Sequence, residues 1–207
     1  MKLTGETKFF IGVIVLTVTI LVGAVVMFSR PPKEVPYETL VPESAWATGS
    51  ANPKATLVEF SDFECPACGA VHPVVKQVVE KYPNDLKFVY RHFPLQKHNF
   101  AQIAAEAAEA AGAQGKFWEM SDLLFKNQSS ISQDIINGLA LELKLDMEKF
   151  TQELNQGTYK NKVNQDLLNG QALGVDATPT FFLNGKKLQL FSFADLDTEV
   201  GKAIGGS

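Results

Sequence analysis

The two cysteines of this chain lie two residues apart, where a predicted strand is followed by a predicted helix. The apolar run 55–60 is typical of a buried strand, and apolar residues recur at helical spacing from Val71 to Tyr82. Pro66 lies at the first helical position, where a missing backbone N–H costs nothing. Free N–H groups and the positive end of the helix dipole favour the thiolate of Cys65, the nucleophilic form of its side chain. The pattern therefore predicts a reactive thiol at a helix N-terminus.

A Cys-x-x-Cys pair such as Cys65 and Cys68 also fits three other interpretations. A zinc site needs about four ligands, yet the chain has no second cysteine pair, and His72, His92 and His98 do not have finger-like spacing. A structural disulfide across two residues closes too small a loop to restrain the unfolded chain much. Two buried, inert thiols are the third alternative. We favour redox chemistry, in which the dithiol itself carries two electrons and no metal or organic cofactor is needed.

The amino end contains twenty residues without a charge, at 9–28, with basic residues on both sides. A helix of that length rises about 30 Å, enough to cross a bilayer core. A cleaved signal peptide usually has an apolar region of only about 7–15 residues, and no small-x-small site directly follows this run. We therefore expect a short tail at 1–8 and an uncleaved transmembrane anchor at 9–28. Basic residues are nearly balanced across the span and do not set its orientation.

Prolines and a Thr-Gly-Ser run interrupt residues 29–53, which predicts a stiff, extended linker. Trp46 within it is a candidate for docking on the domain. From residue 54 to 207 we expect one α/β domain, because 45% hydrophobic content in a chain of 207 residues is enough for one sizeable core. The net charge of −4 and the lack of a basic cluster argue against nucleic acid as a partner.

The order of predicted elements within the domain is strand, helix, strand, helical block, hairpin and helix. The second strand is predicted at 86–90, and helical patterns with caps at Asp146 and Thr158 fill the region from about 98 to 174. Asn184-Gly185 predicts a two-residue hairpin turn between strands at 180–183 and 187–190, and Ser192 with Asp195 begins the last helix. This is the order of a thioredoxin fold with helices inserted in its middle.

Four stretches resemble, in the right order, the DsbA-like family of thioredoxin-fold thiol:disulfide oxidoreductases, and within it the membrane-anchored members of the bacterial cell envelope. They are residues 52–68, 90–95 (Tyr-Arg-His-Phe-Pro-Leu), 114–118 and 174–185. The resemblance covers roughly residues 50 to 206, so the anchor and the linker rest on their own argument. The fold class that we expect is α/β: a thioredoxin fold with an inserted helical subdomain, preceded by an N-terminal transmembrane helix.

The resemblance implies roles for the acid before the cysteine pair and for the cysteines themselves. Cys65 is the expected nucleophile and Cys68 the resolving cysteine. Family members carry a buried acid at the position of Glu59, under the second cysteine. A buried carboxyl has a raised pKa and could exchange a proton with Cys68. On composition alone, a glutamate in a strand faces solvent.

The resemblance also implies how substrate is bound. An X–Pro bond is cis in only about 5–6% of cases, but the family has a cis-proline opposite the cysteine pair, and Pro179 matches it. The backbone of Thr178 would then pair with an extended substrate segment. Pro66 and Ala67 are the other expected substrate contacts. The best-known strong oxidant of the family has a histidine in place of Ala67, so we expect a weaker oxidant here.

The function that follows is oxidation of thiols in unfolded or reduced secreted polypeptides by dithiol–disulfide exchange. Because this chemistry suits an oxidising compartment, we expect a single-pass protein of the cell membrane with its domain outside the cytoplasm. The family implies a quinone-linked membrane thiol oxidase as the redox partner. One alternative is a disulfide reductase or isomerase that uses the same site. Another is a non-catalytic, membrane-tethered peptide-binding module or chaperone. We assign catalysis to none of the histidines.

Overall fold

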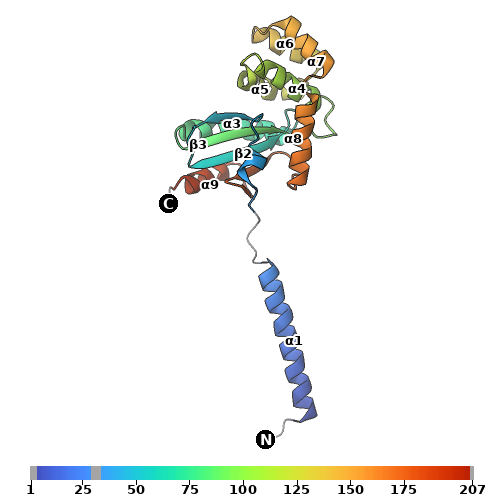
Figure 1. Cartoon of the computed structure of the whole chain (residues 1–207), viewed down its shortest axis with the longest axis vertical. Coiled ribbons are helices and arrows are strands. Elements are labelled where there is room, and N and C mark those ends of the chain that lie inside the picture. The colour runs from blue at the N-terminus through green and yellow to red at the C-terminus, as the bar shows by residue number, and fades with distance from the viewer. Residues whose placement is uncertain (1–3, 29–33, 206–207) are drawn as a thin grey trace. The chain divides into compact units, whose positions relative to one another are not determined.

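A computed structural model describes residues 4–28 and 34–205 of the chain. Contacts between residues divide the chain into two compact units, 1–33 and 34–207. The first unit contains the helix α1 (Gly5–Phe28) (Figure 1). Large apolar side chains such as Phe9 and Leu21 are exposed along it. Among the described residues, no helix meets both the length and the apolar content expected of a membrane span. The anchor at 9–28 therefore stays a prediction.

The described part of the second unit is built on a five-stranded mixed sheet with the strand order β1-β3-β2-β4-β5. Its central strands, β2 (Ala55–Ser61) and β3 (Leu86–His92), are parallel. The flanking strands β1 (Trp46–Gly49), β4 (Thr180–Leu183) and β5 (Lys186–Lys187) each pair antiparallel with their neighbours. Both β2 and β4 are buried along their whole length, as expected for apolar strands covered on both faces.

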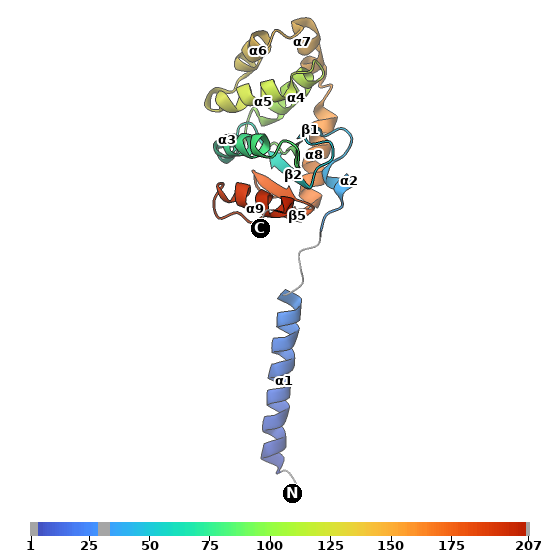
Figure 2. The same ribbon diagram turned by 90° about the vertical axis from the view of Figure 1, so that its left-hand side faces the viewer.

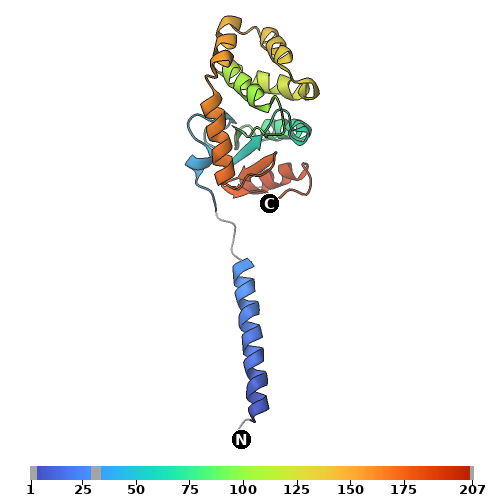
Figure 3. The ribbon, with the colours of Figure 1, turned by 90° about the vertical axis from the view of Figure 1, so that its right-hand side faces the viewer.

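Helices cover both faces of this sheet. Figure 3 shows α8 (Lys160–Ala172) on one face and α3 (Pro66–Lys81) with α9 (Asp195–Ile204) on the other. Leu57 of β2 belongs to the hydrophobic cluster under α3, whereas its neighbour Val58 belongs to the cluster on the α8 side. Because side chains alternate along a strand, Glu59 lies on the same face as Leu57. The strand register therefore places this acid beneath the helix that carries the cysteines.

The helical insertion predicted at about 98–174 lies between β3 and β4. It contains α4 (Ala101–Gly112), α5 (Phe117–Lys126), a short 3-10 helix η1 (Gln128–Ser130), α6 (Gln133–Glu142), α7 (Met147–Gln156) and then α8. Figure 2 shows α6 and α7 farthest from the sheet, with α4 and α5 between them and the rest of the domain. The alanine-rich α4 is almost entirely buried, because small side chains allow the neighbouring helices to approach closely.

The predicted linker is wrong for residues 34–53, which belong to the second unit. The chain forms a short helix, α2 (Tyr37–Leu40), and the edge strand β1. Leu40 is buried in the core cluster on the α8 side, and Trp46 stacks on Phe117 with 4.5 Å between ring centroids. Prolines make this stretch look irregular in sequence. Its few apolar residues are nevertheless stabilised by burial against the domain, and β1 forms hydrogen bonds with the edge of β3 that would otherwise be unpaired.

Other local predictions were confirmed or corrected by backbone geometry. Asp146 caps α7, and Asn184 and Gly185 form the predicted turn, with φ of 48° and 84°. Thr158 does not begin α8: its N–H donates to Glu153 O (3.0 Å) and closes the end of α7, whose last residue is followed by left-handed Gly157. The strand predicted at 187–190 is shorter, since ladder pairing ends at Lys187.

Candidate active site

Cys65 is the N-cap residue of α3, and Pro66 occupies the first turn of the helix as predicted. The turn between β2 and α3 is closed by a hydrogen bond from Cys65 N–H to Asp62 O (3.1 Å), and Gly69 N–H donates to Cys65 O (3.1 Å). Cys65 is 6% exposed and Cys68 is completely buried; both are free thiols in this structure. The nucleophile thus lies at the surface end of the pair.

The Asp62 carboxylate anchors the turn to the segment that follows β3. It is buried, and it accepts hydrogen bonds from Glu64 N (2.8 Å), Leu95 N (2.8 Å) and His98 Nδ1 (2.7 Å). Glu64 continues this connection by accepting from the backbone N–H of Phe100 at 2.6 Å. No local pattern in the sequence marks Asp62, because two of its three partners lie more than thirty positions away in the chain.

Gln128 connects the helical insertion to the same turn. Its side-chain Nε2 donates to Phe63 O (2.9 Å) and to Cys65 O (2.8 Å). Gly69 makes room for this amide, since a Cβ at that position would lie 2.5 Å from Gln128 Oε1. The backbone around the nucleophile is therefore held from two sides, by an acid within its own loop and by an amide from the inserted helices.

The environment of Cys65 favours its anionic form. Hydrogen bonds from the Cys68 thiol, from Thr178 and from the backbone N–H groups of Cys68 and Ala67 outweigh burial and lower the pKa of Cys65 to about 5. As a thiol, Cys65 Sγ donates to Thr178 O over 3.3 Å. The helix N-terminus therefore acts as the sequence predicts, and the neighbouring thiol contributes more than any single backbone group.

The pKa values of Cys68 and Glu59 are raised, whereas that of Cys65 is lowered. Burial, the adjacent Cys65 sulfur and the Glu59 charge raise the pKa of Cys68 well above its ordinary value. Glu59 is 2% exposed, and burial raises its pKa to about 7 although Ser61 Oγ donates to Glu59 Oε1 at 2.6 Å. The structure places Glu59 where the resemblance implies, buried and in electrostatic contact with the second cysteine. Its role as a proton acceptor stays a prediction.

The Thr178–Pro179 peptide bond is cis. Thr178 lies against the nucleophile, since its carbonyl oxygen is 3.3 Å from Cys65 Sγ. A groove of about 600 Å³ opens beside these residues. Its lining comes from the segment after β3, from α8 and from the loop before Pro179, and comprises Cys65, Phe93, Pro94, Leu95, Gln96, Lys97, Leu167, Gln171, Val175, Asp176, Ala177 and Thr178.

The three histidines each lie against a carboxylate. His72 Nε2 is 2.8 Å from Asp122 Oδ1, and buried His92 Nε2 is 2.9 Å from Glu109 Oε1. His98 bonds to Asp62, as described above. Within residues 4–28 and 34–205, no group of three or more His, Cys, Asp or Glu side chains is arranged to hold a metal ion. The cofactor-free dithiol nevertheless remains an expectation.

Solved structures share this fold. BdbD from Bacillus subtilis in its oxidised form superposes with a TM-score of 0.71 at 23% identity, over 80% of this chain and 96% of that one. A thioredoxin-like oxidoreductase from Silicibacter pomeroyi gives 0.69 at 25% identity, over 81% and 96%. The thiol-disulfide exchange protein alpha-DsbA2 from Wolbachia pipientis gives 0.71 at 19% identity, over 80% and 90%.

Curated relatives match the chain more closely in sequence but over a small part of their own length. The Na(+)/H(+) antiporter NhaA 1 of Salinispora arenicola is 40% identical over 147 residues, which is 70% of this chain and 22% of that protein. The antiporter NhaA of Herminiimonas arsenicoxydans is 37% identical over 148 residues, 72% of this chain and 24% of that protein. The antiporter name describes those whole proteins and is not transferred to this chain.

The sheet order, the helices on both faces and the two free thiols at the start of α3 define a thioredoxin fold with a helical insertion. A family model described as thioredoxin matches residues 42–201. The chain belongs to the thioredoxin family.

Proposed function

We propose that the chain is a DsbA-like thiol:disulfide oxidoreductase that oxidises thiols of unfolded or reduced secreted polypeptides. The observation that carries this proposal is the inequality of the two thiols. The pKa of Cys65 is lowered to about 5 at the edge of a groove, whereas that of Cys68 is raised beneath it. At neutral pH the outer sulfur is therefore a thiolate and a good leaving group, and the inner one is a protonated thiol.

The proposed reaction starts from a disulfide between Cys65 and Cys68. A substrate thiolate attacks the sulfur of Cys65; a mixed disulfide forms, the Cys65–Cys68 bond breaks, and Cys68 takes the electron pair. Glu59 gives its proton to the Cys68 thiolate. A second substrate thiolate then attacks the substrate sulfur of the mixed disulfide, and Cys65 leaves as a thiolate. The substrate loses two electrons and the dithiol gains them.

Substrate binding is proposed at the groove beside Cys65. Because Thr178 O already lies 3.3 Å from Cys65 Sγ, an extended segment that pairs with the Thr178 backbone would bring its own sulfur to the nucleophile. Pro66 is exposed and Ala67 is half-buried, and both directly follow the thiol of Cys65 in the chain. The groove has backbone groups on one wall and apolar side chains such as Phe93 and Leu167 on others, which suits unfolded rather than folded segments.

The oxidising direction is favoured by the low pKa of Cys65. A stabilised thiolate stabilises the dithiol relative to the disulfide, and a pair whose reduced form is stabilised is a stronger oxidant. The reductase or isomerase alternative uses the same residues but requires a more stable disulfide.

Equilibration of the oxidised chain with glutathione buffers tests the direction. We expect a reduction potential above about −200 mV, on the oxidising side of glutaredoxins. A value near that of thioredoxin, about −270 mV, would instead support the reductase alternative. The redox state of the pair in cells is a second readout, since an oxidase rests as the disulfide and a reductase as the dithiol.

The non-catalytic alternative is tested by Cys65→Ser. We expect this variant to lose all disulfide formation in a reduced peptide substrate, because no mixed disulfide can form at residue 65. Full biological activity of the Cys65→Ser protein would favour a peptide-binding module or chaperone.

We further propose that residues 9–28 anchor the protein in the cell membrane, with the domain outside the cytoplasm and a quinone-linked membrane thiol oxidase as its oxidant. The support is the uncharged run of the sequence and the suitability of disulfide chemistry to an oxidising compartment. Carbonate extraction of membranes should leave the full chain in the pellet, and external protease should remove its domain. Release of the chain by carbonate would contradict the anchor.

A further inference from the structure

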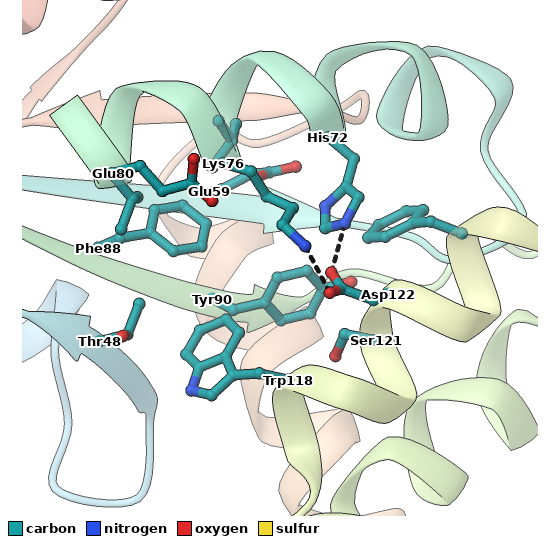
Figure 4. A pocket seen from close by; sticks show the side chains of 13 residues that line it. Thr48, Glu59, His72, Lys76, Glu80, Phe88, Tyr90, Trp118, Ser121 and Asp122 are labelled. Atoms are coloured by element: carbon teal, nitrogen blue, oxygen red, sulfur yellow. Dashed lines mark hydrogen bonds and ion pairs between the residues drawn. The ribbon is translucent and has the colours of Figure 1, made fainter. Parts of the chain in front are cut away.

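A second cavity lies beneath α3, and Glu59 lines this cavity but not the groove beside Cys65. It measures about 190 Å³ and lies between α3, α5 and the sheet, as Figure 4 shows. Its walls are mostly apolar, with charged groups from α3 and α5. The lining residues are Thr48, Glu59, His72, Val75, Lys76, Val79, Glu80, Phe88, Tyr90, Trp118, Ser121, Asp122 and Phe125.

Glu59 requires a path for protons, because the proposed reaction charges and discharges it once in every cycle. It is 2% exposed, and its hydrogen-bond partner Ser61 is equally buried. Direct exchange with bulk solvent is therefore blocked. Cys65 and Cys68 face Glu59 on its active-site side, whereas Glu59 lines the cavity beneath α3. The cavity is thus the side on which Glu59 can exchange protons with solvent.

The Tyr90 hydroxyl indicates that the cavity holds water. Tyr90 lies opposite Glu59 in the parallel register and is 3% exposed. Its OH has no hydrogen-bond partner among the described residues. Leaving a buried hydroxyl unpaired costs about 1–3 kcal/mol, and a cavity of about 190 Å³ is large enough for several waters. Water bonded to this hydroxyl would lie beside Glu59.

The charged end of the cavity is formed by His72, Lys76 and Asp122. Figure 4 shows His72 and Lys76 extending from α3 toward Asp122 of α5, and both side chains bond to its carboxylate. The His72 side chain is 21% exposed and that of Asp122 is 42% exposed, so this end reaches solvent. Burial lowers the pKa of His72 although Asp122 opposes the shift. A neutral imidazole fixed by a carboxylate can accept a proton on one nitrogen and release one from the other.

We propose that this cavity is the proton route between Glu59 and solvent, and that His72, oriented by Asp122, transfers the proton at its outer end. This inference rests on the proposed function. During substrate oxidation, Glu59 donates its proton to the Cys68 thiolate and is reprotonated from solvent through His72 and cavity water. During reoxidation of the dithiol, Cys68 gives the proton back to Glu59, and it leaves by the same path.

The charged and titratable groups around Glu59 are consistent with a two-way path. Cys65 and Cys68 lie on its active-site side, and Tyr90 faces it from β3. Across the cavity lie His72, Lys76 and Glu80 of α3 and Asp122 of α5. Burial raises the pKa of Glu59 to about 7, so both its protonated and its ionised forms are populated near neutral pH.

The test uses the full chain with His72→Ala. We measure the steady-state rate at which the protein oxidises a reduced dithiol peptide at pH 7 in dilute buffer, with oxidised glutathione as the oxidant, because every turnover then includes reprotonation and deprotonation of Glu59. We expect the rate to fall about a hundredfold, at the lower end of the range for loss of general acid–base catalysis. Added imidazole should restore it, because the truncated side chain leaves space for a free imidazole. The wild-type rate should not respond to imidazole.

Two further variants separate proton transfer from packing. His98→Gln removes a histidine that bonds to the active-site turn but does not line this cavity, so imidazole should not change its rate. Val79→Phe fills the cavity and should slow the reaction without rescue. His72→Ala that matches wild type in dilute buffer, or that is slow at every imidazole concentration, overturns the inference.

Failure of this inference is distinguishable from failure of the proposed function. The equilibrium of His72→Ala with glutathione and the pKa of its Cys65 should match wild type, because His72 touches neither sulfur. If the wild-type chain forms no mixed disulfide, the proposed function is wrong. If wild type reacts and His72→Ala behaves identically, only the proton route is wrong.

Discussion

Ala67 lies half-buried between the two cysteines, and its backbone N–H helps to stabilise the Cys65 thiolate while its side chain contributes no donor. Ala67→His adds an imidazole beside that sulfur. We expect the pKa of Cys65 to fall further and the reduction potential to rise, by about 30 mV for each pKa unit. Glutathione equilibration measures the shift. An unchanged potential would show that this argument about residue 67 is wrong.

Glu59 makes stability depend on pH. Its pKa is raised from 4.5 to about 7, so the protonated form is favoured in the folded state. The contribution of this protonation to the free energy of unfolding is fully present below pH 4.5 and is lost as pH rises through 7. The total change is about 3 kcal/mol. Glu59→Gln removes the titration. We expect the free energy of unfolding of this variant, measured in urea, to vary less between pH 5 and 8 than that of wild type.

A parallel curve for wild type and Glu59→Gln over that pH range would contradict the raised pKa. The same variant keeps a hydrogen-bond acceptor for Ser61 Oγ, which bonds to Glu59 Oε1 in the wild-type protein. Loss of that bond therefore does not confuse the comparison.

At the scale of elements, the docking of β1 on the inserted helices depends on one glycine. A Cβ on Gly112 of α4 would lie 2.3 Å from Trp46 Cζ2. We expect Gly112→Ala to destabilise the protein by about 1–3 kcal/mol, since overpacking displaces the indole from Phe117. Chemical denaturation followed by tryptophan fluorescence reports both the loss of stability and the displacement.

Gly138→Ala is the matched control. Gly138 lies within α6, and a Cβ there meets no heavy atom within 4 Å. Because alanine is the better helix former, we expect this variant to gain about 0.5–1 kcal/mol. Equal stability of the two variants would show that Trp46 does not dock as described.

The sequence predicts the elements whose signals are local. The strand before Cys65, the helix after Pro66 and the Asn184-Gly185 turn all follow from short patterns. The regular structure of residues 34–53 could not be predicted, because it depends on burial of Leu40 and Trp46 against residues distant in the chain. The same limit applies to the site: Gln128 lies 63 positions from Cys65, and no local pattern connects them. The prediction that Glu59 is buried came from the family resemblance, because the strand pattern alone favours a solvent-facing glutamate.

At the scale of the whole molecule, the Cys65 thiolate should make the dithiol form more stable than the disulfide form. The folded-state pKa of about 5 lies below the ordinary value of 9.0. The stabilisation is therefore fully present above pH 9 and is lost as pH falls through 5. The disulfide form has no thiolate and lacks this dependence. We expect urea denaturation at pH 7 to give a higher midpoint for the dithiol form, with the difference shrinking toward pH 4.

Should the disulfide form prove the more stable at pH 7, the pair would act as a reductant, and the direction of the proposed reaction would be reversed. The pH dependence of the stability of Cys68→Ala, which lacks the inner thiol and cannot form the disulfide, shows how much of the thiolate stabilisation depends on the hydrogen bond between the two sulfurs.

The most direct test of the central claim is the pH dependence of alkylation of Cys65 by iodoacetamide in the reduced full chain, with thiolate absorbance as a parallel readout. Cys68 is completely buried and should not react on the same timescale. We expect the rate to follow a single ionisation with a pKa of about 5, so that Cys65 is fully reactive at neutral pH. A midpoint near the ordinary cysteine value of about 8.5 would contradict the account.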